Sequence, residues 1–147
     1  MRPQVQVAFD VVSVLQALEV LELAAADIDI IEAGTVLCLS EGLGAVTVLR
    51  EAFPGHPLVA DIRIARAGRK FADMAFGAGA TLVTVIGESP RDVVEGAMAS
   101  ALANNGRVEV ELGESWKPDD VARWVNLGVA NLIVHRPLGV PAGEDVA

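Results

Sequence analysis

Titratable side chains recur in this sequence at one kind of position, where a short apolar run ends. Asp10, Glu32, Asp61, Glu111 and His135 each stand at or next to the end of such a run. If the runs are parallel strands, their carboxyl ends gather at one edge of the sheet, where function collects in α/β folds. A single polar residue there is often only a hydrated strand end, but five at equivalent places favour a shared site.

Two of these acids have the chemistry of a metal site. Glu32 and Asp61 end neighbouring runs, and Mg²⁺ prefers oxygen ligands, usually taking one or two carboxylates from the protein. The same acids could instead pair with Arg63, Arg66 or Arg136 and bind no metal. The residues alone leave both interpretations open.

Six short runs, mostly rich in valine and isoleucine, predict the strands that would position these side chains. They cover residues 5–10, 28–34, 58–61, 81–87, 107–112 and 131–136. Segments with helical spacing and typical start and stop residues lie between them, at residues 13–26, 40–53, 89–106 and 117–128, and Ser13 is the expected N-cap of the first. Alternating strands and helices demand parallel pairing. The pattern fits a (β/α) barrel or an open doubly wound sheet, and the absence of GxGxxG after the first run weakly disfavours the dinucleotide-binding version of the latter.

Composition bounds the class of protein. The 147 residues fit one domain, and a formal net charge of −9 disfavours nonspecific binding to nucleic acid or to an anionic membrane. No apolar run approaches the roughly 20 residues of a membrane span. A single cysteine, Cys38, excludes an internal disulfide framework and is expected to be a small buried residue rather than a nucleophile. We therefore expect a cytoplasmic protein.

Five segments together resemble one enzyme family, that of 3-keto-L-gulonate-6-phosphate decarboxylase and 3-hexulose-6-phosphate synthase, within the orotidine-monophosphate-decarboxylase superfamily. They are VAFD, IDIIEAGTVLCLSEG, LVADIRIARAG, VEVELGESW and VHR, and the resemblance runs in register over essentially the whole chain. It implies a TIM-type parallel (β/α)₈ barrel, Mg²⁺, a phosphorylated sugar as substrate, and a homodimer with active sites at the subunit interface. Within the family, GTVLCLSEG and ELGESW are similar to the decarboxylase branch.

The resemblance also implies roles for individual residues. By position, Glu32 and Asp61 match the metal ligands, and Asp10 and Glu111 match acids that contact substrate. His135 matches the histidine implicated in protonating the intermediate. In the family, decarboxylation leaves an enediolate that the metal and a lysine stabilise before protonation.

The motif that should carry the lysine departs from the family pattern. Instead of Asp-x-Lys-x-x-Asp, the sequence has Asp61-Ile62-Arg63-Ile64-Ala65-Arg66. Arg63 takes the place of the lysine and Arg66 that of the second aspartate. Arginine can balance the charge of an enediolate, but it cannot release a proton at neutral pH. We still expect catalytic roles for both arginines, and substrate binding by Arg136.

A second departure is length. The chain ends shortly after the sixth predicted strand, so residues 1–147 are expected to form a single barrel domain with about six β/α units, apparently lacking the last two. In the family those units carry the phosphate-binding backbone, and phosphate sites after strands seven and eight are common in such barrels.

Three functional hypotheses follow. The leading one is a Mg²⁺-dependent carbon–carbon lyase that decarboxylates a sugar phosphate through an enediolate. The second is an aldolase of the 3-hexulose-6-phosphate synthase type. The third is a non-catalytic homologue, binding a phosphorylated metabolite or purely structural, in which the arginines pair with Asp61 and Glu32. In a dimer, residues 63–76 are expected near the twofold axis.

Overall fold

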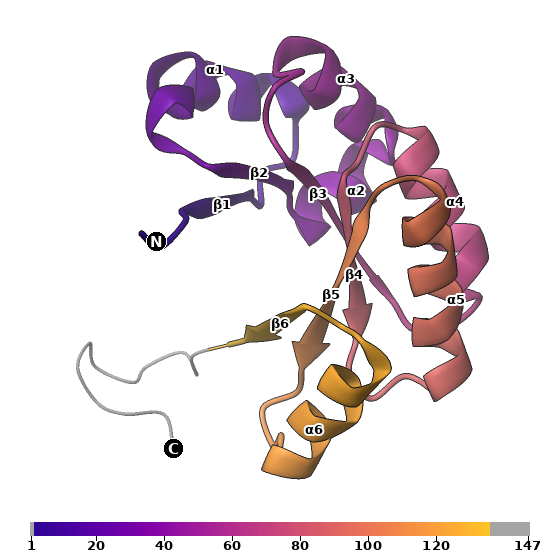
Figure 1. Cartoon of the computed structure of the whole chain (residues 1–147). Helices are drawn as coiled ribbons and strands as arrows, with labels where there is room; N and C mark the ends of the chain where they lie inside the picture. The colour runs from indigo at the N-terminus through magenta and orange to yellow at the C-terminus, as the bar shows by residue number, and fades with distance from the viewer. Residues whose placement is uncertain (1, 136–147) are drawn as a thin grey trace.

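The computed structural model describes residues 2–135 as a strongly curved sheet wrapped by helices (Figure 1). The strands are parallel and adjacent in chain order: Gln6–Phe9 (β1), Ile30–Ala33 (β2), Leu58–Ile64 (β3), Leu82–Ile86 (β4), Arg107–Leu112 (β5) and Asn131–Val134 (β6). A doubly wound sheet would reverse its strand order at a switch point, and this sheet does not. The predicted TIM-type architecture is therefore confirmed as a partial (β/α) barrel.

The helices cover the outer side of the sheet (Figure 1). They are Val14–Ala24 (α1), Thr35–Glu41 (α2), Gly44–Ala52 (α3), Gly68–Gly77 (α4), Arg91–Ala103 (α5) and Pro118–Leu127 (α6), with a 3₁₀ turn at Ala25–Asp27 (η1). Ser13 caps α1 as expected, because its hydroxyl accepts a hydrogen bond from the Leu15 amide. No helix in the described part of the chain is long and apolar enough to cross a membrane.

The prediction of one continuous helix at residues 40–53 was wrong, because the structure has two helices here, α2 and α3. The chain enters α2 directly after β2, at Thr35, and breaks at Gly42 before α3 begins. Gly42 has φ of +64°, a conformation that only glycine adopts without strain. The break between α2 and α3 is therefore explained by the glycine at this position. The early start of α2 brings the Thr35 hydroxyl to the carboxyl end of β2.

Two apolar layers support the sheet. The larger one lies between sheet and helices and contains Leu21, Leu49, Val83 and Trp124. The smaller one consists of Ile30, Val59 and Leu82, which alternate with residues of the larger layer and so face the inside of the curve. It lies in the amino-terminal part of the inner face, and on the same three strands the polar side chains Glu32, Asp61 and Thr84 follow two residues later.

Candidate active site

Asp61 lies on β3 and is held by two threonines. It is 8% exposed, and its carboxylate accepts hydrogen bonds from the Thr84 hydroxyl at 2.6 Å and from the Thr35 hydroxyl. Thr84 comes from the neighbouring β4 and Thr35 from the start of α2. A buried carboxylate needs such donors, and together they fix its direction.

Arg63 occupies a strand irregularity that alternation alone does not predict. β3 continues past the predicted end at residue 61, and its register with β4 shifts between Ala60 and Ile64. Arg63 has φ of +46°, a left-handed conformation that costs a non-glycine residue about 1 kcal/mol or more. Its backbone amide donates to the Thr84 hydroxyl at 2.9 Å, which helps to hold that conformation.

Glu111 joins Arg63 and His135. Its Oε1 accepts from Arg63 Nη2 at 2.7 Å and lies 2.8 Å from His135 Nε2. Arg63 Nε lies 3.9 Å from Asp61 Oδ2, a longer contact. The arginine side chain remains 45% exposed, so its guanidinium is paired yet accessible to a ligand. Four predicted site residues, from β3, β5 and the end of β6, therefore meet in one group.

Glu32 on β2 is half-buried among other acids. Burial is the largest cause that raises its pKa, to about 7, and the negative charges of Asp61, Glu109 and Asp10 raise it further. A hydrogen bond from Gln6 Nε2 at 2.6 Å acts in the opposite direction. Among residues 2–135 no arginine pairs with Glu32, so the ion pairs imagined for an inert site do not form at this acid.

Asp10 lies just after β1 and contacts the start of α2. Its Oδ1 accepts from the Val36 amide at 3.1 Å. A side chain on the neighbouring Gly34 would collide with the Asp10 carboxyl group, because a Cβ there would overlap with Oδ1. The carboxylate is exposed, which keeps it accessible to a ligand as well as to α2.

The structure does not bring Arg66 into this group. It is exposed in the turn between β3 and α4, and no acid of the described residues forms an ion pair with it. Together with Arg63 it borders a cavity of about 380 Å³ whose other walls include Leu43, Ile62 and Phe71. Arg136, expected to bind substrate, lies outside the described residues.

Four polar residues of the inner face were missed from the sequence. Gln6, Thr35, Thr84 and Glu109 hydrogen-bond to the predicted acids or to one another. Only Glu109 carried a signal: it precedes Glu111 by two residues on one strand, so both must face the same side. The threonines look like ordinary strand and helix residues until the fold places them beside Asp61.

A divalent cation is compatible with this donor set. Among residues 2–135 no group of three or more histidine, cysteine or acidic side chains is arranged to hold a metal ion. Mg²⁺, however, usually takes only one or two protein carboxylates and keeps several waters. Glu32 and Asp61 offer that number, and the raised pKa of Glu32 marks a carboxyl group to which a nearby cation would be favourable.

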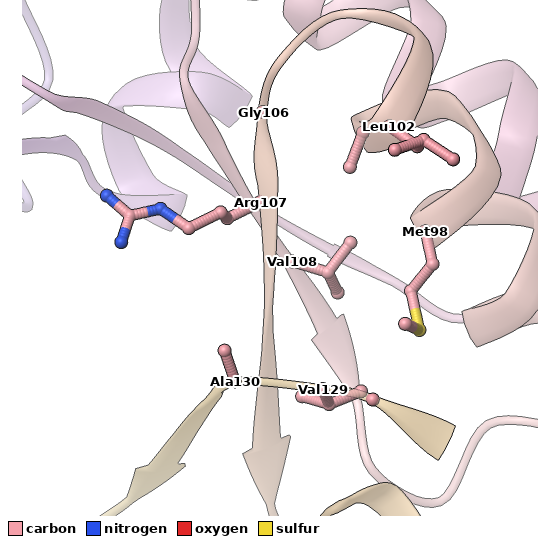
Figure 2. A pocket seen from close by; sticks show the side chains of 9 residues that line it. Met98, Leu102, Gly106, Arg107, Val108, Val129 and Ala130 are labelled. Carbon is pink, nitrogen blue, oxygen red and sulfur yellow. The ribbon is translucent and has the colours of Figure 1, made fainter.

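A second cavity lies far from these acids in the fold. It has a volume of about 170 Å³ and lies at the amino-terminal ends of β5 and β6. Figure 2 shows Met98, Leu102, Val108 and Val129 around it, while the Arg107 side chain points away. Its mainly apolar lining offers no group suited to acid–base or metal chemistry.

Known proteins resemble the chain in both sequence and structure. A relative from Escherichia coli strain K12, 3-keto-L-gulonate-6-phosphate decarboxylase SgbH, is 44% identical over 92% of this chain and 61% of its own length. A structure of that type of decarboxylase from Streptococcus mutans, in complex with ribose 5-phosphate, superposes with a TM-score of 0.88 at 32% identity, covering 94% of this chain and 68% of the other. A 3-hexulose-6-phosphate synthase structure gives 0.89 at 36% identity, covering 97% and 70%.

The chain spans somewhat less than two thirds of the length of the curated relatives, 61% and 62% for SgbH and for the UlaD decarboxylase of Escherichia coli strain K12 / DH10B. UlaD is 37% identical over 91% of this chain. The family model described as orotidine 5'-phosphate decarboxylase / HUMPS family matches residues 3–142. The chain therefore belongs to the orotidine 5'-phosphate decarboxylase / HUMPS family.

Proposed function

We propose that the protein is a Mg²⁺-dependent carbon–carbon lyase that decarboxylates a sugar phosphate of the 3-keto-L-gulonate 6-phosphate type through an enediolate. The observation that carries the proposal is the meeting of Asp61, Arg63, Glu111 and His135 at the carboxyl ends of their strands. The similarity to enzymes named as decarboxylases supports the choice of reaction.

Glu32 and Asp61 are the residues that we propose to hold the cation. When bound, Mg²⁺ would act as a Lewis acid that stabilises negative charge on substrate oxygens. The electrostatics support this assignment, because burial and then the charges of the surrounding acids raise the pKa of Glu32, and a cation would favour its charged form. Thr35 and Thr84 hold the Asp61 carboxylate in a fixed direction.

Arg63 is the proposed counter-charge for the enediolate. Its guanidinium carries a positive charge and presents donors to the space beside Asp61. Glu111 holds this side chain by one contact and leaves it 45% exposed, so other donors can reach a substrate oxygen. Asp10 is the proposed partner for substrate hydroxyl groups, as is Glu111 through Oε2, which has no hydrogen-bond partner among residues 2–135. Arg136 is a further proposed substrate contact.

His135 is the proposed proton donor to the enediolate. A hydrogen bond between Nε2–H and Glu111 would leave Nδ1 as the nitrogen that takes up and delivers a proton. The imidazole is 53% exposed, so it can exchange that proton with solvent. Arg63 cannot take this role, because arginine does not release a proton at neutral pH. Arg66 is proposed to bind an anionic group beside the cavity that it borders with Arg63.

The synthase-type aldolase is the second candidate. It is favoured by the TM-score of 0.89 and 36% identity to a 3-hexulose-6-phosphate synthase structure. The same enediolate-stabilising group would serve both reactions, so the residues around Asp61 do not separate them. Product analysis does: CO₂ release identifies the decarboxylase, and formation of a hexulose 6-phosphate identifies the synthase.

We also propose that the protein works as a homodimer with residues 63–76 near the twofold axis. Two apolar side chains of this segment are exposed, Phe71 by 40% and Met74 by 51%, which favours burial against a second copy. Sedimentation of the full-length protein should give a dimer at micromolar concentration, and Phe71→Glu should shift it towards monomer. A monomeric wild type would contradict this part of the proposal.

The reaction is tested by CO₂ release from 3-keto-L-gulonate 6-phosphate with the full-length protein. We expect turnover with Mg²⁺, loss of turnover with excess EDTA, and recovery on adding Mg²⁺ back. Glu32→Gln is expected to prevent that recovery at metal concentrations that saturate the wild type. Turnover that is unchanged by EDTA would contradict the metal assignment, and absence of turnover under all conditions would favour the non-catalytic alternative.

A further inference from the structure

Glu109 is the most buried acid on the inner face, and the proposed chemistry does not use it. It is 3% exposed and lies two residues before Glu111 on β5. Among residues 2–135 no cation forms an ion pair with it. Its partners are two amides: Asn131 Nδ2 donates to Oε1 at 3.0 Å, and Gln6 Nε2 donates to Oε2 at 3.4 Å. Burying a carboxylate without a cation is costly, so Glu109 depends on these two hydrogen bonds, of which the one from Gln6 is the longer.

Gln6 connects this acid to Glu32. The same Nε2 that faces Glu109 donates to Glu32 Oε2 at 2.6 Å. An amide NH₂ group carries two protons, so one nitrogen can serve two carboxylates at once. Glu32 lies on β2, which pairs with β1, whereas Glu109 lies on β5, which does not. The Gln6 amide nitrogen therefore joins acids from two strands that are not neighbours in the sheet. The amide therefore has its nitrogen turned towards both acids.

The contacts form a chain across the concave side of the sheet. It runs from Asn131 on β6 to Glu109 on β5, then to Gln6 on β1 and Glu32 on β2. Gln6 engages only Oε2 of Glu32, and Oε1 has no hydrogen-bond partner among residues 2–135. One carboxylate oxygen is thus fixed by the chain, and the other is left for a ligand.

We propose that Gln6 and Glu109 are positioning residues that set the direction of the Glu32 carboxylate, with Asn131 holding Glu109 from its other side. The inference rests on the proposed function in taking Glu32 as a cation ligand. Glutamate has three side-chain torsions, so without a fixed partner its carboxylate would sample many directions. Partners of this kind behind a metal ligand typically change metal affinity by about 10- to 100-fold when they are removed.

The first test measures Mn²⁺ affinity of the full-length protein by electron paramagnetic resonance. Gln6→Leu is expected to weaken binding by about tenfold or more. Glu109→Gln keeps an acceptor for Gln6, whereas Glu109→Leu does not, and both remove the charge. We therefore expect Glu109→Leu to bind Mn²⁺ more weakly than Glu109→Gln. Wild-type affinity in Gln6→Leu, or equal loss in the two Glu109 variants, would overturn the inference.

Ser100→Ala is the matched control. The Ser100 hydroxyl is buried and donates to Asp73 at 2.5 Å between α5 and α4, remote from the acids of the inner face. Its loss is expected to lower the melting temperature without changing Mn²⁺ affinity. If Ser100→Ala weakens Mn²⁺ binding as much as Gln6→Leu, the effect is general destabilisation and the inference fails.

A second readout needs no metal. The ¹³C signal of the Glu32 carboxyl carbon in metal-free protein should move in Gln6→Leu and in Glu109→Leu, and return towards wild type in Glu109→Gln. If the wild type binds no Mn²⁺, the metal part of the proposed function fails, and this signal alone decides the positioning roles. An unchanged Glu32 signal in both leucine variants would overturn them.

Discussion

Arg50 and Arg63 carry the same functional group at opposite ends of the sheet, and their partners differ. Arg50 lies on α3 and donates to backbone carbonyls near the amino-terminal ends of β3 and β4: Gly79 at 2.8 Å from Nε, and His56 at 2.8 Å and Pro54 at 2.9 Å from Nη1. Arg63 contacts two carboxylates, Glu111 and Asp61, at the carboxyl ends. One arginine binds backbone and the other binds titratable groups.

The difference agrees with the proposed division between a stabilising arginine and a catalytic one. Burial lowers the pKa of Arg50, and its contacts join the loops that precede β3 and β4. Arg63 is half exposed and sits in a left-handed conformation, which costs energy for a residue other than glycine. In barrels of this type the amino-terminal face is associated with stability and the carboxyl-terminal face with catalysis.

The largest effect is expected from Arg63→Ala. If this guanidinium balances the enediolate, its loss should lower turnover by about two orders of magnitude or more, a barrier increase of roughly 3 kcal/mol. The free energy of unfolding should change by less than about 1 kcal/mol, because an exposed ion pair contributes little. Steady-state CO₂ release and urea unfolding measure the two quantities. Arg63→Lys, which keeps the charge, is the control, and a variant that loses only stability would support the non-catalytic alternative.

Arg50→Ala should give the opposite result. Removing a side chain with several backbone hydrogen bonds should lower the free energy of unfolding by about 2–3 kcal/mol. Turnover per folded molecule should stay close to wild type, because Arg50 lies at the other end of the sheet. Arg50→Lys should recover part of the stability, since lysine keeps the charge without the planar arrangement of donors. A hundredfold loss of turnover in folded Arg50→Ala would break the proposed division between the two ends.

A smaller effect should appear as a pH dependence of stability. Folding raises the pKa of Glu32 from 4.5 to about 7, so between these values the native state binds more protons than the unfolded chain. The free energy of unfolding must therefore fall as pH rises through this window. Because Glu32 is partly exposed, we expect the free energy of unfolding to fall by only about 1–2 kcal/mol over this pH window.

Urea unfolding of metal-free protein between pH 4.5 and 8 measures this slope. Glu32→Gln should remove the contribution, so that the difference between variant and wild type grows with pH. Saturating Mg²⁺ should reduce the fall in the wild type, because a cation favours the charged carboxylate. A wild type and a Glu32→Gln variant with parallel pH profiles would contradict the raised pKa.

The sequence predicted the part of this site that depends only on where the strands end and on which side chains share a face of the sheet. Asp61, Glu111 and His135 were expected at one edge because parallel strands bring their carboxyl ends together, and the structure brings them together. The left-handed Arg63 was not predictable, because its conformation depends on a register shift against β4. The contact of Gln6 with Glu109 was also hidden, since it joins residues 103 positions apart across a curve that only the folded sheet creates.

The most direct test of the central claim is CO₂ release from 3-keto-L-gulonate 6-phosphate by two forms of the full-length protein with Mg²⁺. One form is the natural protein, and the other is Arg63→Lys combined with Arg66→Asp, which restores the family's motif at this site. We predict measurable turnover in the natural protein and a higher rate in the double variant. If neither form releases CO₂, the catalytic interpretation is contradicted and a binding or structural role remains for the acids and arginines of this site.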